Sequence, residues 1–219
     1  MSIPADSAAL RRRKPTRLVV LGVAALALIV AMALDTKIVA IGSPEAVKPG
    51  VFSPDAFGAA EFPKIKTDVE ARAVDAQLLA TALAADKAAA VKQYGVPNGT
   101  GGTVFSVKLT GVAGDAKSGV YDVAVTGLPD TIGIRVQTGP AINGTDLRDA
   151  TGTIKFGQFV NQIEYQNAGS ALNREMKKQI LEPVDTANLK GKTISVIGAF
   201  KLINPKKWLV TPVKLDIQP

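Results

Sequence analysis

Asp146, Arg148 and Asp149 are the densest group of side chains in this chain that could do chemistry, with two carboxylates and a guanidinium within four residues. In an exposed loop the arginine would bind an anion or sugar hydroxyls, and the carboxylates would orient it. Alternatively, Asp149 caps a turn and Arg148 pairs with a neighbouring carboxylate as a structural clamp. We favour the clamp and keep ligand binding as the alternative hypothesis.

A second candidate group combines amides with an aromatic ring at Asn161, Gln162 and Tyr165. Amides both donate to and accept from sugar hydroxyls, and an aromatic ring stacks on the apolar face of a sugar. Trp208, the only tryptophan, follows two lysines and is a further candidate stacking surface. The structural explanation is backbone hydrogen bonding for the amides and core packing for Trp208, and we favour it here as well.

The chain contains no His and no Cys. This composition excludes serine–histidine hydrolysis, histidine–zinc sites, thiolate chemistry and lipidation at cysteine. The sequence has no spacing typical of a metal site, a phosphate loop or a dinucleotide fingerprint, so we expect no metal and no cofactor. A glycan-processing enzyme that uses carboxylates alone, with Asp146 and Asp149 as its pair, remains the alternative. We therefore predict a binding or accessory module rather than an enzyme.

The N-terminal part of the chain contains a basic cluster at 11–17, and an uncharged apolar run at 18–34 follows it directly. Positive charge stays on the cytoplasmic side of such a run. We predict a cytoplasmic stub at 1–17, a single-pass transmembrane anchor in the bacterial inner membrane at 18–34, and a periplasmic remainder. A signal peptide cleaved at Ala33 and a twin-arginine export signal are the alternatives.

The net charge of +7 gives little support to nucleic-acid binding. The first 17 residues hold five basic side chains and one acidic side chain, which leaves +3 for the remaining chain. Most of the excess charge therefore belongs to the predicted membrane signal. We expect no nucleic-acid partner.

Proline, glycine and serine are frequent between residues 35 and 64, which predicts an irregular periplasmic stalk. A capping-box pattern over 67–70 predicts the start of an Ala-rich helix that runs to Tyr94 and ends at Gly95. Alternating apolar residues then predict three strands, at 105–109, 121–125 and 132–136, with a turn over 111–119. These three strands read as an antiparallel meander.

The second half of the chain contains one ambiguous stretch. Residues 141–149 read as a polar loop, and 151–165 fits a strand kinked at Gly157, with a helix as the alternative. A helix is predicted at 168–181, followed by strands at 194–202 and 209–217. The exported domain, 65–219, is therefore α+β, with a helix before the last two strands. That order is the plan of an OB-like small barrel, and a different antiparallel sheet with a helix on one face stays open.

Three places carry a family resemblance: Asp35–Val39, Gly144–Ala150 with Phe156–Gln162, and Leu189–Lys192 with Trp208–Val213. On these residues the chain resembles a family of uncharacterised bacterial predicted periplasmic lipoproteins, a domain of unknown function. Many members carry a lipidated Cys in the first place, where this chain has Thr36. The resemblance implies a periplasmic accessory role beside a sugar ABC transporter, with its components as partners. We therefore expect a membrane-anchored module that serves sugar uptake.

Overall fold

The computed structural model describes residues 16–35, 51–98 and 102–218, and the chain divides into two units, 1–51 and 52–219. The first unit contains α1 (Thr16–Asp35), and its side chains from Val19 onward are all exposed. No helix in the described ranges is both long enough and apolar enough to cross a membrane. The predicted transmembrane anchor at 18–34 is therefore not confirmed.

Two predictions about the N-terminal region concern residues that the structure does not describe. They are the basic cluster before Thr16 and the junction at Thr36.

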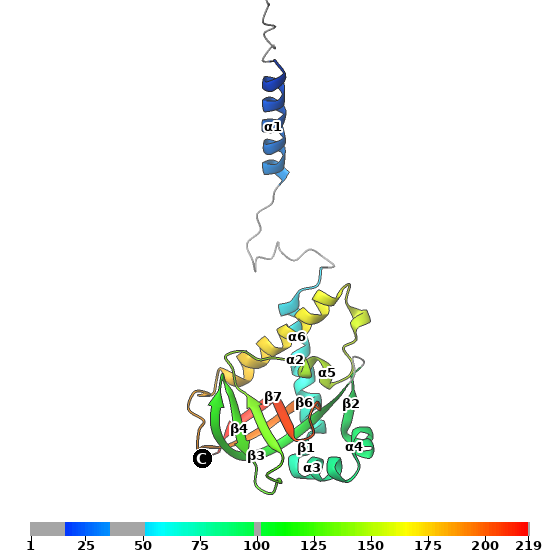
Figure 1. Ribbon diagram of the computed structural model, residues 1–219, viewed down its shortest axis with the longest axis vertical. Helices are drawn as coiled ribbons and strands as arrows, with labels where there is room; N and C mark the ends of the chain where they lie inside the picture. Colours follow the sequence, from blue (N-terminus) through cyan, green and yellow to red (C-terminus); the bar gives the residue numbers. More distant parts are fainter. Residues whose placement is uncertain (1–15, 36–50, 99–101, 219) are drawn as a thin grey trace, which may run out of the picture. The chain divides into compact units, whose positions relative to one another are not determined.

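The second unit is built on a closed barrel of five strands: β3 (Thr103–Lys117), β4 (Val120–Ala124), β5 (Gly133–Gln137), β6 (Thr193–Lys201) and β7 (Lys207–Ile217). The spatial order is β3-β4-β5-β7-β6, and β6 pairs back onto β3. Only the β5–β7 pair in this ring is parallel. The antiparallel meander and the helix before the last two strands are both confirmed (Figure 1).

The predicted turn over 111–119 is wrong, because β3 continues to Lys117. A register shift between Ala113 and Ala116 bends the strand there, and glycine at 111 and 114 allows that bend. The chain reverses only at Ser118 and Gly119, which both have positive φ.

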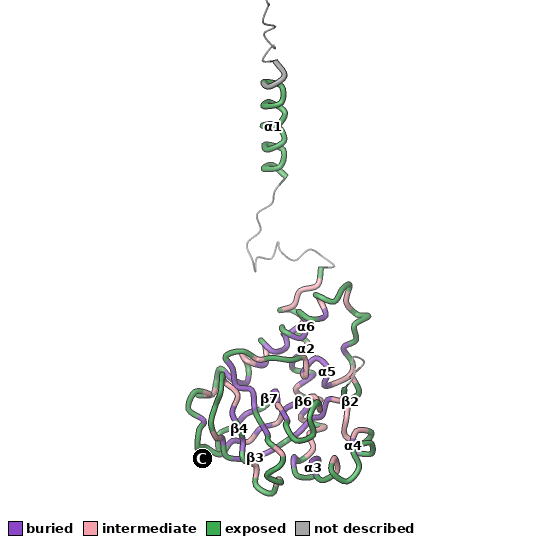
Figure 2. The backbone as a smooth tube through the Cα atoms, viewed as in Figure 1, coloured by how far each residue is buried: buried purple, intermediate pink, exposed green. Residues whose placement is uncertain are grey.

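Three aromatic rings form a stack within the hydrophobic core. Trp208 is fully buried and stacks on Phe200 with ring centroids 4.7 Å apart, and Phe200 stacks on Phe105 at 5.7 Å. The indole Nε1 of Trp208 donates to the backbone oxygen of Pro205 at 2.9 Å, which satisfies its one polar group. Figure 2 shows that the buried residues follow the barrel strands and the helix faces turned toward them.

The predicted irregular stalk instead contains most of a helix, α2 (Pro54–Arg72). Ser53 is its N-cap and Pro54 occupies its first turn, where a missing N–H costs nothing. Phe62, Ile65 and Val69 are buried at helical spacing and hold it on the barrel. The proline-rich composition therefore marked the start of a helix rather than a flexible segment.

The Ala-rich helix predicted over 67–94 ends at Tyr94 with Gly95 as its cap, as predicted, but its start at Thr67 and its continuity are wrong. Thr67 lies inside α2, and its hydroxyl donates to the Pro63 oxygen. After α2 the chain forms β1 (Val74–Asp75), α3 (Ala76–Ala85), α4 (Lys87–Tyr94) and β2 (Gly95–Pro97). The carboxylates of Asp75 and Asp86 accept backbone N–H groups as N-caps, and so each begins a new helix.

The polar loop predicted over 141–149 ends in a short helix, α5 (Asp146–Ala150). The kinked strand predicted over 151–165 is wrong, because that stretch forms a 3-10 turn (Phe156–Gln158) and then α6 (Gln162–Met176). Asn161 caps α6 by accepting the Glu164 N–H at 2.9 Å. The helix predicted at 168–181 is confirmed, and its last residues continue as a π-helical turn (Lys177–Leu181).

Helix α6 lies against α2, and the two make a close contact at Gly58. A Cβ at Gly58 would lie 2.9 Å from the backbone oxygen of Ala171. This approach fixes the position of α6, whose first turns carry Tyr165.

Candidate functional site

A cleft of about 200 Å³ opens beside α5, between the end of β2, the loop after α5 and the start of α6. Its lining residues are Pro97, Asn98, Asp149, Gly152, Ile154, Lys155, Phe156 and Tyr165. Segments that are far apart in the sequence therefore build one concave site.

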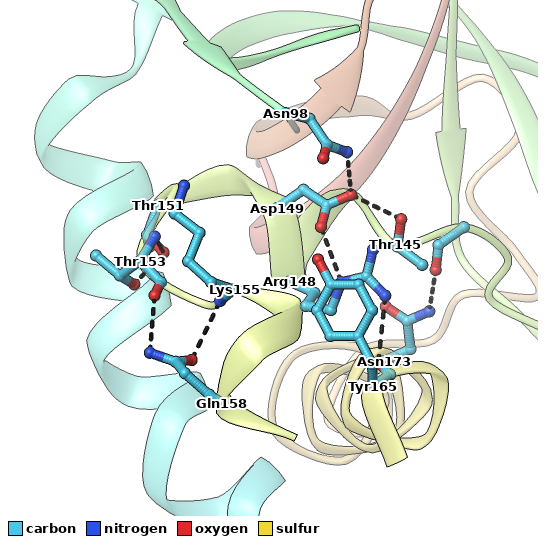
Figure 3. Close-up of polar contacts among 11 residues, drawn as sticks. Asn98, Thr145, Arg148, Asp149, Thr151, Thr153, Lys155, Gln158, Tyr165 and Asn173 are labelled. Atoms are coloured by element: carbon cyan, nitrogen blue, oxygen red, sulfur yellow. Dashed lines mark hydrogen bonds and ion pairs between the residues drawn. The ribbon is translucent and has the colours of Figure 1, made fainter. Parts of the chain in front are cut away.

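Asp149 is the polar centre of the cleft, and its side chain is only 3% exposed. Its Oδ1 accepts from Arg148 Nε at 2.8 Å, and its Oδ2 accepts from Asn98 Nδ2 at 2.6 Å and from Thr145 Oγ1 at 2.8 Å (Figure 3). A buried carboxylate needs such partners, because an unpaired buried polar group is costly. The hydrogen bonds fix both of its oxygens in place.

Arg148 forms the buried ion pair with Asp149. Its guanidinium carbon lies 3.6 Å from the centre of the Tyr165 ring, and its Nη1 donates to the Tyr165 backbone oxygen at 3.2 Å. Burial raises the pKa of the Tyr165 hydroxyl, against the lowering effect of the Arg148 charge. The hydroxyl therefore stays neutral, and the ring face is covered by the Arg148 guanidinium.

The rim of the cleft is an ordered loop with an exposed aromatic ring. Phe156 is 50% exposed and meets Tyr165 edge-on, with ring centroids 5.7 Å apart. Gln158 braces the loop by accepting the Lys155 N–H at 3.1 Å and donating to the Thr153 oxygen at 3.2 Å (Figure 3). Because these bonds hold the loop, Phe156 stays in place although half of it faces solvent.

Asp146 is the second carboxylate of the motif, but it does not line the cleft described above. Burial, and after it the negative charge of Asp149, raise its pKa to about 6, while Lys201 opposes the shift. This carboxyl group therefore titrates near neutral pH.

The structure separates the remaining predicted site residues from the cleft. Asn161 and Gln162 are exposed at the start of α6, where Asn161 serves as the cap, and Trp208 lies in the barrel core. Tyr165 and Asp149 do line the cleft, and Arg148 lies beneath them. Sequence reasoning missed Asn98, Lys155 and Phe156. Asn98 lies just after the predicted helix end at Gly95, and Phe156 lies in the stretch predicted as a kinked strand.

Metal binding has no support in the part of the chain that the structure describes, since no three acidic side chains gather there as a set of ligands. The cleft supplies one engaged carboxylate, an amide, an ammonium group and aromatic rings. This set can recognise a small polar molecule through hydrogen bonds and ring stacking.

The barrel and its cleft define a small α+β protein of the OB class. A similar structure is the crystal structure of an OB-fold protein from Thermotoga maritima, which is 20% identical with a TM-score of 0.60. The match covers 77% of this chain and 99% of that one, and it establishes the fold. No curated protein matches the chain.

The chain belongs to the family described as predicted periplasmic lipoprotein, a domain of unknown function, whose model matches residues 23–216. The predicted family resemblance is therefore confirmed. The family description supports a periplasmic location. The chain itself has no Cys that could carry a lipid.

Proposed function

We propose that this protein is a non-catalytic, periplasmic binding module that takes a small polyhydroxylated ligand, such as a single sugar, in the cleft beside Asp149. The observation that carries the proposal is the lining itself. The rings of Phe156 and Tyr165 share a small concave site with the amide of Asn98 and the ammonium group of Lys155. A sugar needs both kinds of surface, because its hydroxyls form hydrogen bonds and its ring face is apolar.

The size of the cleft limits the ligand. At about 200 Å³ it is smaller than the roughly 300–1,000 Å³ typical of sites for drug-sized molecules. A single sugar ring, or the end of a longer glycan, suits this volume better than a nucleotide or an extended oligosaccharide.

The hydrogen bonds of Asp149 support binding rather than catalysis. Arg148, Asn98 and Thr145 already donate to its two oxygens, so the carboxylate is not available as a nucleophile or a general base. The Asp149 carboxylate instead holds the Asn98 side chain at the cleft through their hydrogen bond, and it fixes the floor of the cleft.

Calorimetric titration of the full-length chain with a set of pentoses and hexoses tests this proposal. We expect one sugar to bind the wild type and to bind Phe156→Ala at least about tenfold more weakly, as expected for the loss of a stacking ring. Ile203→Ala is the matched control, since Ile203 is also exposed but lies between β6 and β7. Absence of heat with every sugar, or equal affinity in both variants, would overturn the proposal.

A carboxylate-dependent glycan-processing enzyme is the second candidate, and the raised pKa of Asp146 favours it. A carboxyl group with a raised pKa can act as the general acid of such an enzyme. If this candidate is right, the wild type hydrolyses a glycan and Asp146→Asn does not. Hydrolysis that survives in Asp146→Asn, or none in the wild type, rules it out.

An accessory role in sugar uptake follows from the family resemblance, and we propose it for this chain as well. A deletion strain should then take up the sugar found by calorimetry more slowly than its parent. Normal uptake in the deletion strain would overturn the accessory role in uptake, and the proposal of sugar binding would then be judged by calorimetry alone.

A further inference from the structure

The domain carries an exposed apolar surface at the end where α6 begins. Phe156, Val160 and Ile163, which we call the apolar tip, are 50%, 85% and 69% exposed. The other large apolar side chains exposed on the described part of this unit, Leu78, Val112, Ile203 and Ile217, lie on other elements. Clustering of this kind marks an interaction surface, whereas scattered apolar residues do not.

Aromatic packing makes the apolar tip rigid. Phe159 meets Phe52 and Phe57 at ring-centroid distances of 5.3 and 5.6 Å, and it meets Tyr165 at 5.4 Å. The Val160 N–H donates to Glu164 Oε2 at 3.0 Å, which draws this acidic group onto the backbone. The tip is therefore a fixed apolar surface, and it does not depend on a flexible loop.

The course of the chain indicates what covers this surface. Phe52 is the first residue of the domain, and its ring packs under the tip against Phe159. Only residues 36–51 separate it from α1, whose described side chains are exposed and, up to Leu34, apolar on every face. A helix that is apolar on all sides requires an apolar environment. Phe52, whose ring packs against Phe159 next to the tip, is thus the first part of the domain to follow this exposed apolar helix along the chain.

We infer that the apolar tip inserts into the surface of a lipid bilayer, with Val160 and Ile163 in the interfacial region. Exposed aliphatic and aromatic side chains beside a lysine are typical of such contacts, and Lys155 is exposed next to Phe156. Phe156 belongs to both the tip and the cleft, whereas Val160 and Ile163 do not line the cleft, so the proposal places the cleft at the edge of the membrane contact.

A single fluorophore tests this proposal, because the chain has no natural cysteine to compete for the label. The labelled variants are Val160→Cys and, as the matched control, Ile203→Cys, since both side chains are 85% exposed. Each full-length variant is reconstituted into vesicles of phosphatidylethanolamine and phosphatidylglycerol with brominated acyl chains. We expect the bromolipid to quench the label at position 160 about twofold or more, and the label at 203 to be unaffected.

A second change separates membrane contact from a folding defect. Adding Ile163→Asp to the Val160→Cys variant should abolish the quenching while circular dichroism and the sugar calorimetry stay unchanged. Equal quenching at both positions, or none at position 160, would overturn the proposal. Cross-linking between copies through position 160 would also overturn it, because the tip would then be covered by a second copy of the chain.

Discussion

The guanidinium carbon of Arg148 lies 3.6 Å from the centre of the Tyr165 ring, and the same side chain forms a buried ion pair with Asp149. Helix α5 supplies the two charges, and α6 supplies the ring that covers them. This contact ties together the floor and the wall of the cleft. The proposed binding site therefore depends on an interaction that also stabilises the fold.

Replacing Asp149 with Ala should strongly destabilise the protein. The change leaves the Arg148 charge buried without its partner and removes the acceptor for Asn98 and Thr145. We expect the free energy of unfolding, measured with urea, to fall by about 3–5 kcal/mol. Asp55→Ala is the control, because Asp55 pairs with Arg174 at the surface and should lose at most about 1 kcal/mol. Similar losses in the two variants would contradict this account of Asp149.

Stability should depend on pH through Asp146. The folded state raises its pKa from the usual 3.8 to about 6, so the folded protein binds its proton more tightly than the unfolded chain. The stabilising contribution is therefore complete below about pH 4 and is lost as the pH rises through about 6, a change on the order of 2–3 kcal/mol. Urea unfolding from pH 4 to 7 should show this fall in the wild type but not in Asp146→Asn. The same fall in both proteins would show that another group is responsible.

The fluorescence of Trp208 should respond to unfolding of the core and not to binding of a ligand. Its side chain is fully buried, so iodide should scarcely quench its fluorescence in the folded protein. A bound sugar should leave the emission unchanged, while unfolding in urea should make the indole accessible to iodide. Strong quenching in the folded state would instead support Trp208 as an exposed stacking surface.

A larger side chain at Gly58 should separate α2 from α6. A Cβ there already lies within 3.2 Å of Ala171 backbone and side-chain atoms, so Gly58→Val must displace one helix. We expect a loss of about 1–3 kcal/mol in urea denaturation. Gly157→Val is the control, since a Cβ at Gly157 meets no atom within 4 Å and its cost should be within about 0.5 kcal/mol. Equal costs would show that the helix contact is not tight.

The barrel strands could be predicted because alternation is strong wherever one face is buried. In β4, for example, Tyr121 and Val123 are buried while Asp122 and Ala124 are exposed. Alternation alone could not show that β3 runs through its glycines, because the bulge that bends it depends on pairing with β4. Closure of the barrel depends likewise on the long-range pairing of β3 with β6.

The helices and the cleft were harder to predict, for two physical reasons. Pro54 and Pro63 read as breaks, but the first occupies a helix N-terminus and the second lies within a helix held by tertiary packing. The apolar residues at 156, 160 and 163 fitted one face of the alternative helix, yet they are exposed, so their spacing carried no information about burial. The cleft unites Asn98, Asp149 and Phe156 from separate segments, and only the folded chain brings them together.

The most direct test of ligand binding at the cleft is a nitrogen-15 NMR titration of the full-length chain with the sugar that gives heat in calorimetry. The account predicts that the largest shifts fall on the amides of Asn98, Lys155, Phe156 and Tyr165, and that Phe156→Ala weakens them. Shifts centred on another surface, or no shifts in the presence of saturating sugar, would contradict it.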